Sequence, residues 1–253
     1  MRHLVETALL THGLRSITND EIQKVWTDHE SNIAWVSEGN VVVGDIEAYL
    51  KFRGKAENLI RINSDTLENA LKEGLSGALT ASGTLAVCEK LGIPLAVTCG
   101  MGGISDGDRI CQDLSALAAL PVALITTGPK DMMDREATIK WLTDRGVQVL
   151  GTKRDFCSGY IFVGENVALQ GVYGRERKEI KSSTLLIREI PEEKRVQNHE
   201  FLKAGVEAGK KAAAEGRSFH PAVNGKIDEL TDGYSSRIQL KSLLENVKFA
   251  KSL

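Results

Sequence analysis

Two short apolar runs, residues 94–97 and 121–125, constrain the fold of this chain more than any other feature. Each run is too short for an independent helix, carries no charge and is followed by threonine and then glycine, as strands buried on both faces are. A helical segment begins near residue 112 and separates them, which is the pattern of a βαβ-like unit. The sequence therefore predicts an α/β protein with three α/β/α layers around a mostly parallel or mixed sheet.

The rest of the chain supports one domain that covers residues 1–253, because no linker, repeat or low-complexity tract divides it. Residues 4–13 read as an apolar N-terminal strand interrupted by a single carboxylate. Residues 191–216 are expected to form one long helix, and two further helices follow it. Residues 174–181 are rich in charge and are expected to be exposed.

Bulk properties exclude several classes of partner. A formal net charge of -2 and a pI near 6.2 argue against nucleic acid or an anionic membrane as the main partner. No apolar run approaches the ~18–20 residues that span a bilayer, so the sequence predicts a cytoplasmic protein. The four cysteines lack C-x-x-C spacing, and the five histidines show no pair at metal-ligand spacing.

Three ionisable residues are expected near the carboxyl edge of the sheet, where ligands of open α/β folds collect. A glutamate such as Glu6 is costly to bury in a strand unless it is paired or protonated, and catalytic acids are often buried in this way. A position at the edge of the sheet, with the carboxylate facing water, explains Glu6 equally well. Lys130 follows the second apolar run, where a desolvated amine can attack a carbonyl, but most lysines at strand ends are simply solvated. Asp113 opens a helical run, where a carboxylate also stabilises the helix.

A glycine-rich turn follows the first apolar run. Residues 100–107 contain four glycines, and such a turn can present backbone N–H groups to a phosphate or an oxyanion. The spacing matches neither the dinucleotide-binding fingerprint nor the P-loop sequence. The turn therefore indicates an anion site more than a nucleotide site.

Taken together, the motifs resemble the pseudouridine-5'-phosphate glycosidase family, which includes the indigoidine synthase A-like proteins. The resemblance runs from end to end, and the order and spacing of the motifs make it specific. The matching segments are V-E-T-A-L-L-T-H-G, G-A-L-T-A-S-G-T-L-A, G-I-P-L-A-V-T-C-G-M-G-G, Q-D-L-S-A-L, T-T-G-P-K-D-M-M-D, W-L-T-D-R-G-V-Q-V-L-G-T, I-P-E-E and E-L-T-D-G-Y-S-S-R-I-Q-L.

This resemblance implies an α/β/α homotrimer with a divalent metal, usually manganese. It implies a hydro-lyase that reversibly cleaves the C–C glycosidic bond of pseudouridine 5'-phosphate to uracil and ribose 5-phosphate. Lys130 falls on the nucleophile that forms a Schiff base with the opened sugar, and Glu6 falls on the proton donor. The substrate-binding positions implied here are Arg61, Ala81, Gly102, Gly103, Cys111, Gln112, Asp113, Arg188 and Arg237.

At the metal site the chain departs from the family pattern. The family's metal-binding aspartate, four residues before the counterpart of Asp113, appears here as Arg109. Asp108 is the substitute ligand that we expect, with Asp106 as the other choice. A cation beside Arg109 is disfavoured by like charge, so the manganese implied by the resemblance is in doubt.

Other departures change the charge of the expected pocket. The family's loop histidine appears as Ser105, and a substrate-contacting lysine appears as Arg61, which can hold a phosphate with two hydrogen bonds. Two asparagines of the family appear as Arg188 and Arg237. Three arginines at these positions predict a more cationic pocket.

Three hypotheses for the function remain open. The first is a lyase that uses Lys130 to act on pseudouridine 5'-phosphate or a close analogue. The second keeps the Schiff-base chemistry but acts on a different phosphosugar, or synthesises a C-glycoside. The third is a non-catalytic protein that binds a sugar phosphate. Function has to be decided from the site, because one fold serves many activities.

Overall fold

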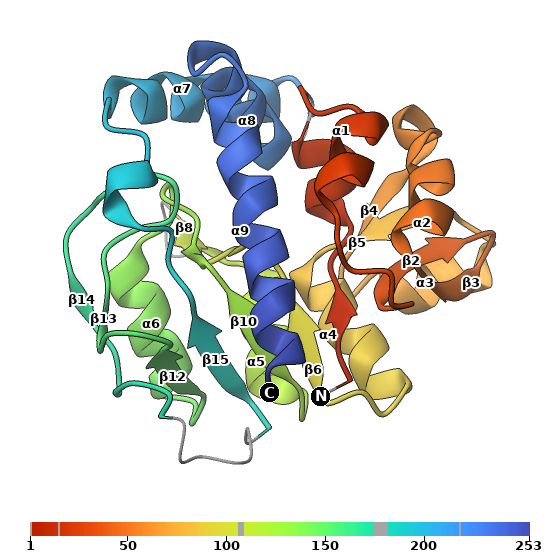
Figure 1. Cartoon of the computed structure of the whole chain (residues 1–253), viewed down its shortest axis with the longest axis horizontal. Coiled ribbons are helices and arrows are strands. Elements are labelled where there is room, and N and C mark those ends of the chain that lie inside the picture. Colours follow the sequence, from red (N-terminus) through yellow and green to blue (C-terminus); the bar gives the residue numbers. More distant parts are fainter. Residues whose placement is uncertain (1, 15, 106–108, 175–181, 218) are drawn as a thin grey trace.

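A mixed β-sheet crosses the whole molecule and carries a layer of helices on each face (Figure 1). The computed structural model describes residues 2–14, 16–105, 109–174, 182–217 and 219–253. In spatial order, the strands of the sheet are β12 (Gln148–Gly151), β15 (Thr184–Ile187), β10 (Ala123–Thr126), β6 (Leu95–Val97), β1 (Leu4–Val5), β2 (Ile33–Ser37), β5 (Gly77–Leu79) and β4 (Ile60–Ile62), with β3 (Asn40–Gly44) paired to β2.

Most of this sheet is parallel. From β12 to β2 every neighbouring pair is parallel, and the register sets Leu124 opposite Ala96 and Val97 opposite Val5. The strand β5 runs antiparallel to β2, and β3 folds back on β2 as a hairpin. The two apolar runs thus form neighbouring parallel strands, β6 and β10, as predicted from the sequence. The three-layer fold with a mixed sheet is confirmed.

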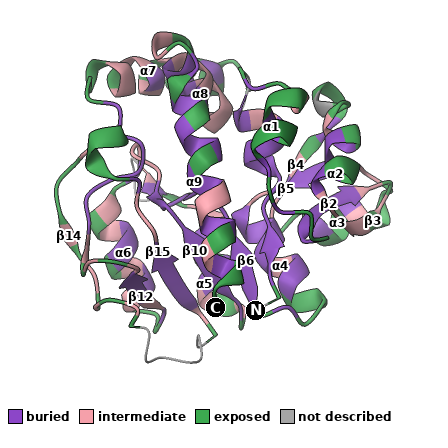
Figure 2. Ribbon diagram, viewed as in Figure 1, coloured by how far each residue is buried: buried purple, intermediate pink, exposed green. Residues whose placement is uncertain are grey.

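The two faces of the sheet are covered by different helices. One apolar core lies under the helices α3 (Leu67–Lys72), α4 (Ala81–Lys90), α5 (Gln112–Ala119) and α6 (Arg135–Thr143). The other lies under α1 (Asn19–Val25), α2 (Ile46–Arg53), α8 (Phe219–Leu230) and α9 (Tyr234–Lys251). Neighbouring residues of β1 serve different cores, because side chains alternate along a strand. Figure 2 shows the central strands β15, β10 and β6 as buried, whereas β3 at the edge of the sheet is partly exposed.

Short paired segments extend the chain beyond the carboxyl edge of the sheet. After β6 the chain forms β7 (Gly100–Met101), which pairs in parallel with β11 (Gly128–Pro129) after β10. A small antiparallel pair then joins β8 (Ile104–Ser105) to β9 (Arg109–Ile110), and a second pair joins β13 (Phe156–Cys157) to β14 (Val167–Ala168). The parallel strands point toward the end of the molecule that carries α7 (Glu200–Ala214) and α8 (Figure 1).

The expected N-terminal strand is much shorter than the sequence suggested. The strand ends at Val5, and Leu9–Gly13 form a short π-helix. The reason is the side chain of Thr7, whose hydroxyl donates to the Ala34 carbonyl at 2.8 Å and accepts from the Leu79 amide at 3.0 Å. The Thr7 hydroxyl thus bonds to β2 and β5 in place of a backbone hydrogen bond between the two strands. The main chain after Val5 can therefore leave the sheet.

The expected long helix over residues 191–216 is also wrong in its first part. A single 3₁₀ turn covers Glu192–Lys194, and the α-helix α7 begins only at Glu200. Arg195 interrupts the helix because its buried guanidinium donates to the Ile190 carbonyl at 2.8 Å and pairs with Glu189 at 3.0 Å. These bonds draw the segment into the protein interior.

Residues 175–181, expected to be exposed, lie outside the described residues. Among the helices that the structure describes, none has both the length and the apolar character needed to cross a bilayer.

Candidate active site

Glu6, Lys130 and Arg61 line one cavity at the carboxyl edge of the sheet. The three residues come from different strands: Glu6 follows β1, Lys130 follows β11, and Arg61 lies in β4. The cavity has a volume of about 10 Å³ and holds one water molecule at most. Its remaining lining residues are Ala8, Leu9, Gly13, Gly100, His220, Pro221 and Asn224.

Backbone bonds to one short segment hold the acid and the amine in place. The Glu6 amide donates to the Val97 carbonyl at 2.9 Å, and the Lys130 amide donates to the Met101 carbonyl at 3.0 Å. The hydroxyl of Thr98, within the same segment, donates to the Glu6 carboxylate. Residues 97–101 therefore set the relative position of Glu6 and Lys130.

The helix α9 also holds this segment. The Asn246 amide donates to the Thr98 carbonyl at 2.9 Å and to the Thr127 hydroxyl at 3.2 Å. Gln239 accepts a hydrogen bond from the Tyr160 hydroxyl at 3.0 Å. Gly100 has room only because it lacks a side chain, since a Cβ there would lie 2.5 Å from the Tyr160 ring. The turns that carry the site are thus tightly packed.

Burial governs the charge state of Glu6, whose side chain is almost inaccessible. Desolvation raises the pKa of Glu6 above its ordinary value, against the opposing effects of the Lys130 ammonium and the Thr98 hydrogen bond. A carboxyl group with a raised pKa keeps its proton to higher pH. Glu6 is therefore suited to donate a proton inside the cavity.

His220 lines the same cavity and was not singled out from the sequence. Burial lowers the pKa of His220 to about 3, and the positive charges of Lys130 and Arg61 act in the same direction. The imidazole is therefore neutral at pH 7. The histidines were assessed from the sequence only as metal ligands. The sequence feature that marks His220 is its place before a proline at the start of an amphipathic helix.

Asp113 does not line the cavity, but it joins the start of α4 to the turn that follows β7. One carboxylate oxygen accepts from the Ser82 amide at 2.9 Å, and the other accepts from the Gly102 amide at 2.8 Å. The close approach needs Gly102, because a Cβ there would lie 2.2 Å from the sulfur of Cys111. The structure therefore gives Asp113 a positioning role.

Replacing Asp113 with Asn is expected to destabilise the fold by about 1–3 kcal/mol. The amide nitrogen of Asn cannot accept a hydrogen bond, so one of the two buried backbone N–H groups loses its partner. Urea unfolding of the variant measures the loss. The control is Asp144→Asn on the exposed end of α6, where loss of the surface pair with Lys140 is expected to cost less than about 1 kcal/mol. Equal stability of Asp113→Asn and the unchanged protein would contradict the positioning role.

An open groove of about 450 Å³ adjoins the cavity, and His220 lines both. Gly103, Cys111 and Ser105 form part of its wall. Burial, reinforced by the charge of Asp113, raises the pKa of the Cys111 thiol to about 12. The other residues of the groove are Arg109, Ile110, Met132, Met133, Val206, Lys210, Ala213 and Phe219.

Two of the three expected arginines lie away from the cavity. Arg188 follows β15 and pairs with Glu245 of α9 at 2.9 Å. Arg237 lines a different groove, between α1 and α9, and donates to the Asp232 carbonyl. Of these three arginines, Arg61 is the one that lines the cavity within the described chain, and a substrate pocket with all three stays a prediction. Ala81 and Gln112 begin the helices α4 and α5 and do not line it either.

The described residues do not form a metal site. They contain no group of three or more His, Cys, Asp or Glu side chains that could hold an ion. Both oxygens of Asp113 already accept backbone hydrogen bonds, and Arg109 brings a positive charge to the groove. Asp108, the expected substitute ligand, and Asp106 lie outside the described residues. The donors that the structure shows do not fit manganese.

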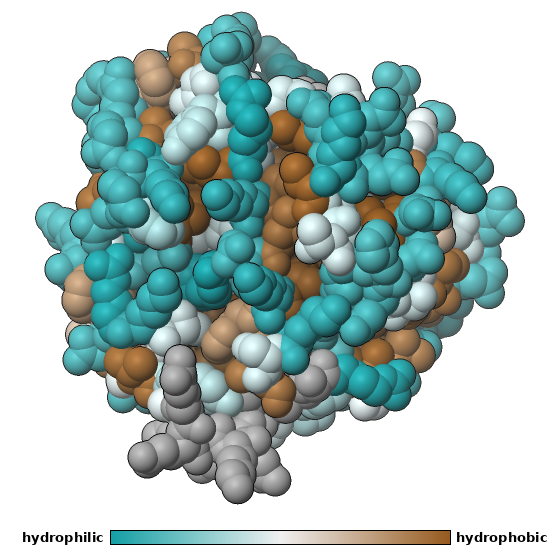
Figure 3. Space-filling view, in the orientation of Figure 1, coloured by the Kyte–Doolittle hydropathy of each residue, from teal (hydrophilic) through white to brown (hydrophobic). Residues whose placement is uncertain are grey.

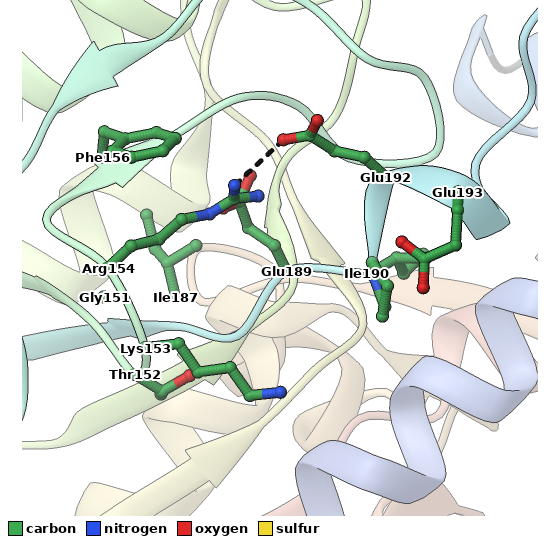
Figure 4. Close-up of a pocket in the computed structure, with 11 residues that line it drawn as sticks. Gly151, Thr152, Lys153, Arg154, Phe156, Ile187, Glu189, Ile190, Glu192 and Glu193 are labelled. Carbon is green, nitrogen blue, oxygen red and sulfur yellow. Dashed lines mark hydrogen bonds and ion pairs between the residues drawn. The ribbon is translucent and has the colours of Figure 1, made fainter.

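Two further hollows lie apart from these residues. One, of about 850 Å³, runs between α1 and α9 and is visible as an apolar strip in Figure 3. The other, of about 410 Å³, lies beyond β12 and β15 (Figure 4). In it Arg154 pairs with Glu189 and Glu192, each at 2.9 Å.

The fold and the site define an α/β protein with a buried carboxyl group and an amine in one cavity at the carboxyl edge of its sheet. Residues 4–253 match the indigoidine synthase A like proteins, and the chain belongs to this family. The resemblance stated from the sequence motifs is thus confirmed. The chain is 26% identical to the pseudouridine-5'-phosphate glycosidase of Petrotoga mobilis, over 98% of this chain and 89% of that protein. It is 28% identical to that of Thermotoga neapolitana, over 97% and 92% of the two chains.

Two solved structures share the fold. One is an indigoidine synthase A-like protein from Thermotoga maritima, with a TM-score of 0.76, 22% identity, and coverage of 98% of this chain and 90% of that one. The other is the prealnumycin C-glycosynthase AlnA in complex with ribulose 5-phosphate, with a TM-score of 0.76, 22% identity, and coverage of 98% and 88%. At this identity the likeness establishes the fold alone.

Proposed function

We propose that this protein is a lyase of the pseudouridine-5'-phosphate glycosidase type, which cleaves the C–C glycosidic bond of a C-nucleoside 5'-phosphate. The observation that carries the proposal is the shared cavity of Glu6, Lys130 and Arg61. It combines a nucleophile, a proton donor and a fixed positive charge for a phosphate. The names of the curated relatives support the same chemistry.

The proposed reaction begins at C1' of the ribose. The Lys130 ammonium first releases a proton to solvent. Its amine then forms a bond to C1', the bond from C1' to the ring oxygen breaks, and a proton passes from nitrogen to that oxygen. Glu6 then protonates the aglycone carbon. The C1'–carbon bond breaks as the nitrogen lone pair forms a C=N bond. Water hydrolyses the resulting Schiff base, Glu6 recovers its proton, and ribose 5-phosphate leaves.

This scheme explains why one carboxyl group is enough. An O-glycosidase needs two carboxyl groups, one of which protonates the leaving oxygen. A C–C glycosidic bond has no leaving oxygen, so the amine takes over the second role. A sugar phosphate exceeds the present cavity of about 10 Å³, so residues that line the cavity have to separate when substrate enters.

Incubation with pseudouridine 5'-phosphate tests the proposal, with uracil and ribose 5-phosphate quantified by liquid chromatography. Equal amounts of the two products support it. Binding of the nucleotide without turnover favours the non-catalytic hypothesis instead. Turnover in the reverse direction, from uracil and ribose 5-phosphate, is measured in the same way, because the reaction is proposed to be reversible.

The groove favours a second candidate, in which the aglycone is larger than uracil. Its volume of about 450 Å³ and its side chains Met132, Met133 and Phe219 suit a bulky aromatic ring. The second hypothesis, a Schiff-base enzyme that acts on a different C-glycoside, therefore remains a candidate. Comparing turnover of pseudouridine 5'-phosphate with that of phosphorylated C-glycosides of naphthols separates the two.

Activity is expected to persist without a divalent metal. The charge of Arg109 and the occupied oxygens of Asp113 leave no described set of ligands for an ion. After dialysis against EDTA, turnover is therefore expected to change by less than about twofold. A twofold change corresponds to about 0.4 kcal/mol of transition-state stabilisation. A loss that added manganese restores would contradict this prediction.

The homotrimer and the cytoplasmic location stay predictions. The apolar groove between α1 and α9 (Figure 3) shows that one face of the chain carries exposed apolar surface.

A further inference from the structure

Thr98 directly follows the apolar strand β6, and its side chain is completely buried. Its hydroxyl donates a hydrogen bond to Oε2 of the Glu6 carboxyl group. The other oxygen, Oε1, receives no hydrogen bond from any residue that the structure describes. The two oxygens of Glu6 are therefore not equivalent, and Oε1 is the one left for a ligand in the cavity that Glu6 lines.

The main chain of Thr98 is held on both sides, so its hydroxyl has little freedom to move. The Thr98 amide donates to the Ile125 carbonyl of β10 at 2.9 Å, and the Thr98 carbonyl accepts from the Asn246 amide of α9 at 2.9 Å. Asn246 also donates to the Thr127 hydroxyl, which lies 2.6 Å from the Ser242 hydroxyl of the same helix. In addition, the β-branched side chain of threonine restricts its own χ1 angle. The Thr98 hydroxyl is thus a fixed donor.

A fixed donor at Oε2 determines which oxygen of the neutral acid carries the proton. In a carboxylic acid one oxygen holds the hydrogen, and the other accepts hydrogen bonds. With the proton on Oε2, the Thr98 hydroxyl would have to turn and accept it, and its own hydrogen would lose its acceptor. Leaving a buried hydroxyl without an acceptor is costly. The proton of Glu6 is therefore favoured on Oε1.

We propose, on the basis of the function proposed above, that Thr98 is the positioning residue of the general acid. Its hydroxyl holds Oε2 of Glu6 and leaves Oε1 to carry the proton that goes to the aglycone carbon. Once that proton has left, the same hydrogen bond stabilises the carboxylate. Oε1 recovers a proton when water hydrolyses the Schiff base. Thr98 itself neither gains nor loses a proton.

The surroundings of Glu6 show what this hydrogen bond achieves. Burial raises the pKa of Glu6, and the charge of Asp113 adds to the rise. The Lys130 ammonium, the Thr98 hydrogen bond and the charge of Arg61 oppose it. A buried acid is thus kept strong enough to release its proton. The other titratable groups around Glu6 are uncharged at pH 7, because burial shifts the pKa of each away from that value: His220, Cys99, Tyr49 and Tyr160.

The test compares the unchanged protein with Thr98→Val, Thr98→Ser and Thr84→Val. Val keeps the shape of threonine without its hydroxyl, and Ser retains the hydroxyl. The matched control is Thr84, which is buried in α4 and donates to the Thr80 carbonyl at 2.9 Å. Thr84→Val therefore removes a buried hydroxyl that does not bond to Glu6.

Three measurements are made on each protein. The first is the titration of the Glu6 carboxyl group, followed by ¹³C NMR of the substrate-free protein; the Glu6 signal is the one that Glu6→Gln lacks. The second is turnover of pseudouridine 5'-phosphate, with kcat taken at the pH where each protein is fastest. The third is borohydride trapping of ribose 5-phosphate on Lys130 after long incubation, which does not need the acid.

In Thr98→Val the midpoint of the Glu6 titration is expected to rise by about one pH unit, because the carboxylate loses a hydrogen bond. The kcat is expected to fall by about tenfold and KM by less than about threefold, since the hydroxyl acts on the acid and not on substrate binding. Trapping is expected to stay complete, which also shows that the variant folds. Thr98→Ser and Thr84→Val are expected to match the unchanged protein. If Thr98→Val does not fold, Thr98→Ala takes its place.

An unchanged Glu6 titration or an unchanged kcat in Thr98→Val would overturn the proposal. So would a Thr98→Ser variant that behaves like Thr98→Val, because the hydroxyl would then not be the group that acts. Failure of the proposed function has a different signature. In that case the unchanged protein shows neither turnover nor trapping, while the Glu6 titration still separates Thr98→Val from Thr98→Ser.

Discussion

Replacing Lys130 with Ala is expected to reduce turnover of the C-nucleotide by at least about 1,000-fold, because removal of a covalent nucleophile costs a large share of the rate enhancement. Borohydride trapping of ribose 5-phosphate is expected to vanish at the same time, since no other lysine lines the cavity within the described chain. Mass spectrometry of the reduced protein measures the trapped adduct. This is the largest effect that the structure predicts.

The matched control is Lys140→Ala, in the middle of α6. Lys140 is exposed and pairs with Asp144 at the end of the same helix, so its loss is expected to leave turnover and trapping unchanged. An adduct that survives in Lys130→Ala would place the nucleophile elsewhere and refute the scheme. Turnover that survives without any adduct would refute covalent catalysis as such.

Replacing Glu6 with Gln is expected to lower kcat by about 10²–10⁴-fold, the range for loss of a general acid. Gln keeps the size of the side chain and can still accept the hydrogen bond from Thr98. Trapping on Lys130 is expected to persist, because the amine and the cavity remain. The control is Glu47→Gln in the first turn of α2, which is expected to retain full activity. Normal turnover in Glu6→Gln would remove Glu6 from the mechanism.

The pH dependence of stability provides an independent check on Glu6. Because burial raises the pKa of Glu6, the folded protein retains a proton at pH values where the unfolded chain has released it. The stability of the unchanged protein should therefore fall as pH rises above the ordinary value of 4.5 toward the folded value. Glu6→Gln removes the ionisable group and therefore the loss of stability that its ionisation causes at higher pH. Its Tm is expected to exceed that of the unchanged protein at pH 8 and to equal it at pH 4, as scanning fluorimetry at both pH values can measure; a lower Tm at pH 8 would show that the carboxylate is stabilised by its partners.

Much of the sheet could be predicted because its central strands carry a local signal. The runs that became β6 and β10 are apolar, uncharged and short, so their burial and parallel pairing follow from sequence pattern alone. The meeting of Glu6 and Lys130 follows in turn, because parallel strands end at one edge. The end of β1 could not be predicted, since it depends on the bonds of Thr7 to two strands far away in sequence.

Side-chain direction was the other limit on prediction. The family resemblance aligned Arg188 and Arg237 with substrate contacts, but Glu245 holds the first and the Asp232 carbonyl holds the second. Glu245 is 57 residues from Arg188 in the sequence, and a bond from Arg237 to a backbone carbonyl of its own segment has no sequence signal. The position of His220 depends on how α8 packs against α7, which is tertiary information with no local sequence signal.

The anchoring of Glu6 and Lys130 to residues 97–101 separates two kinds of change in this protein. The acid and the amine depend on one inner stretch of main chain. The wall of the groove is built from α7, α8, the loop after β11 and the segment that carries β8 and β9. Mutations in that outer wall can alter which aglycone fits without shifting the acid relative to the amine. A scaffold divided in this way can acquire new substrates while its bond-making step stays constant.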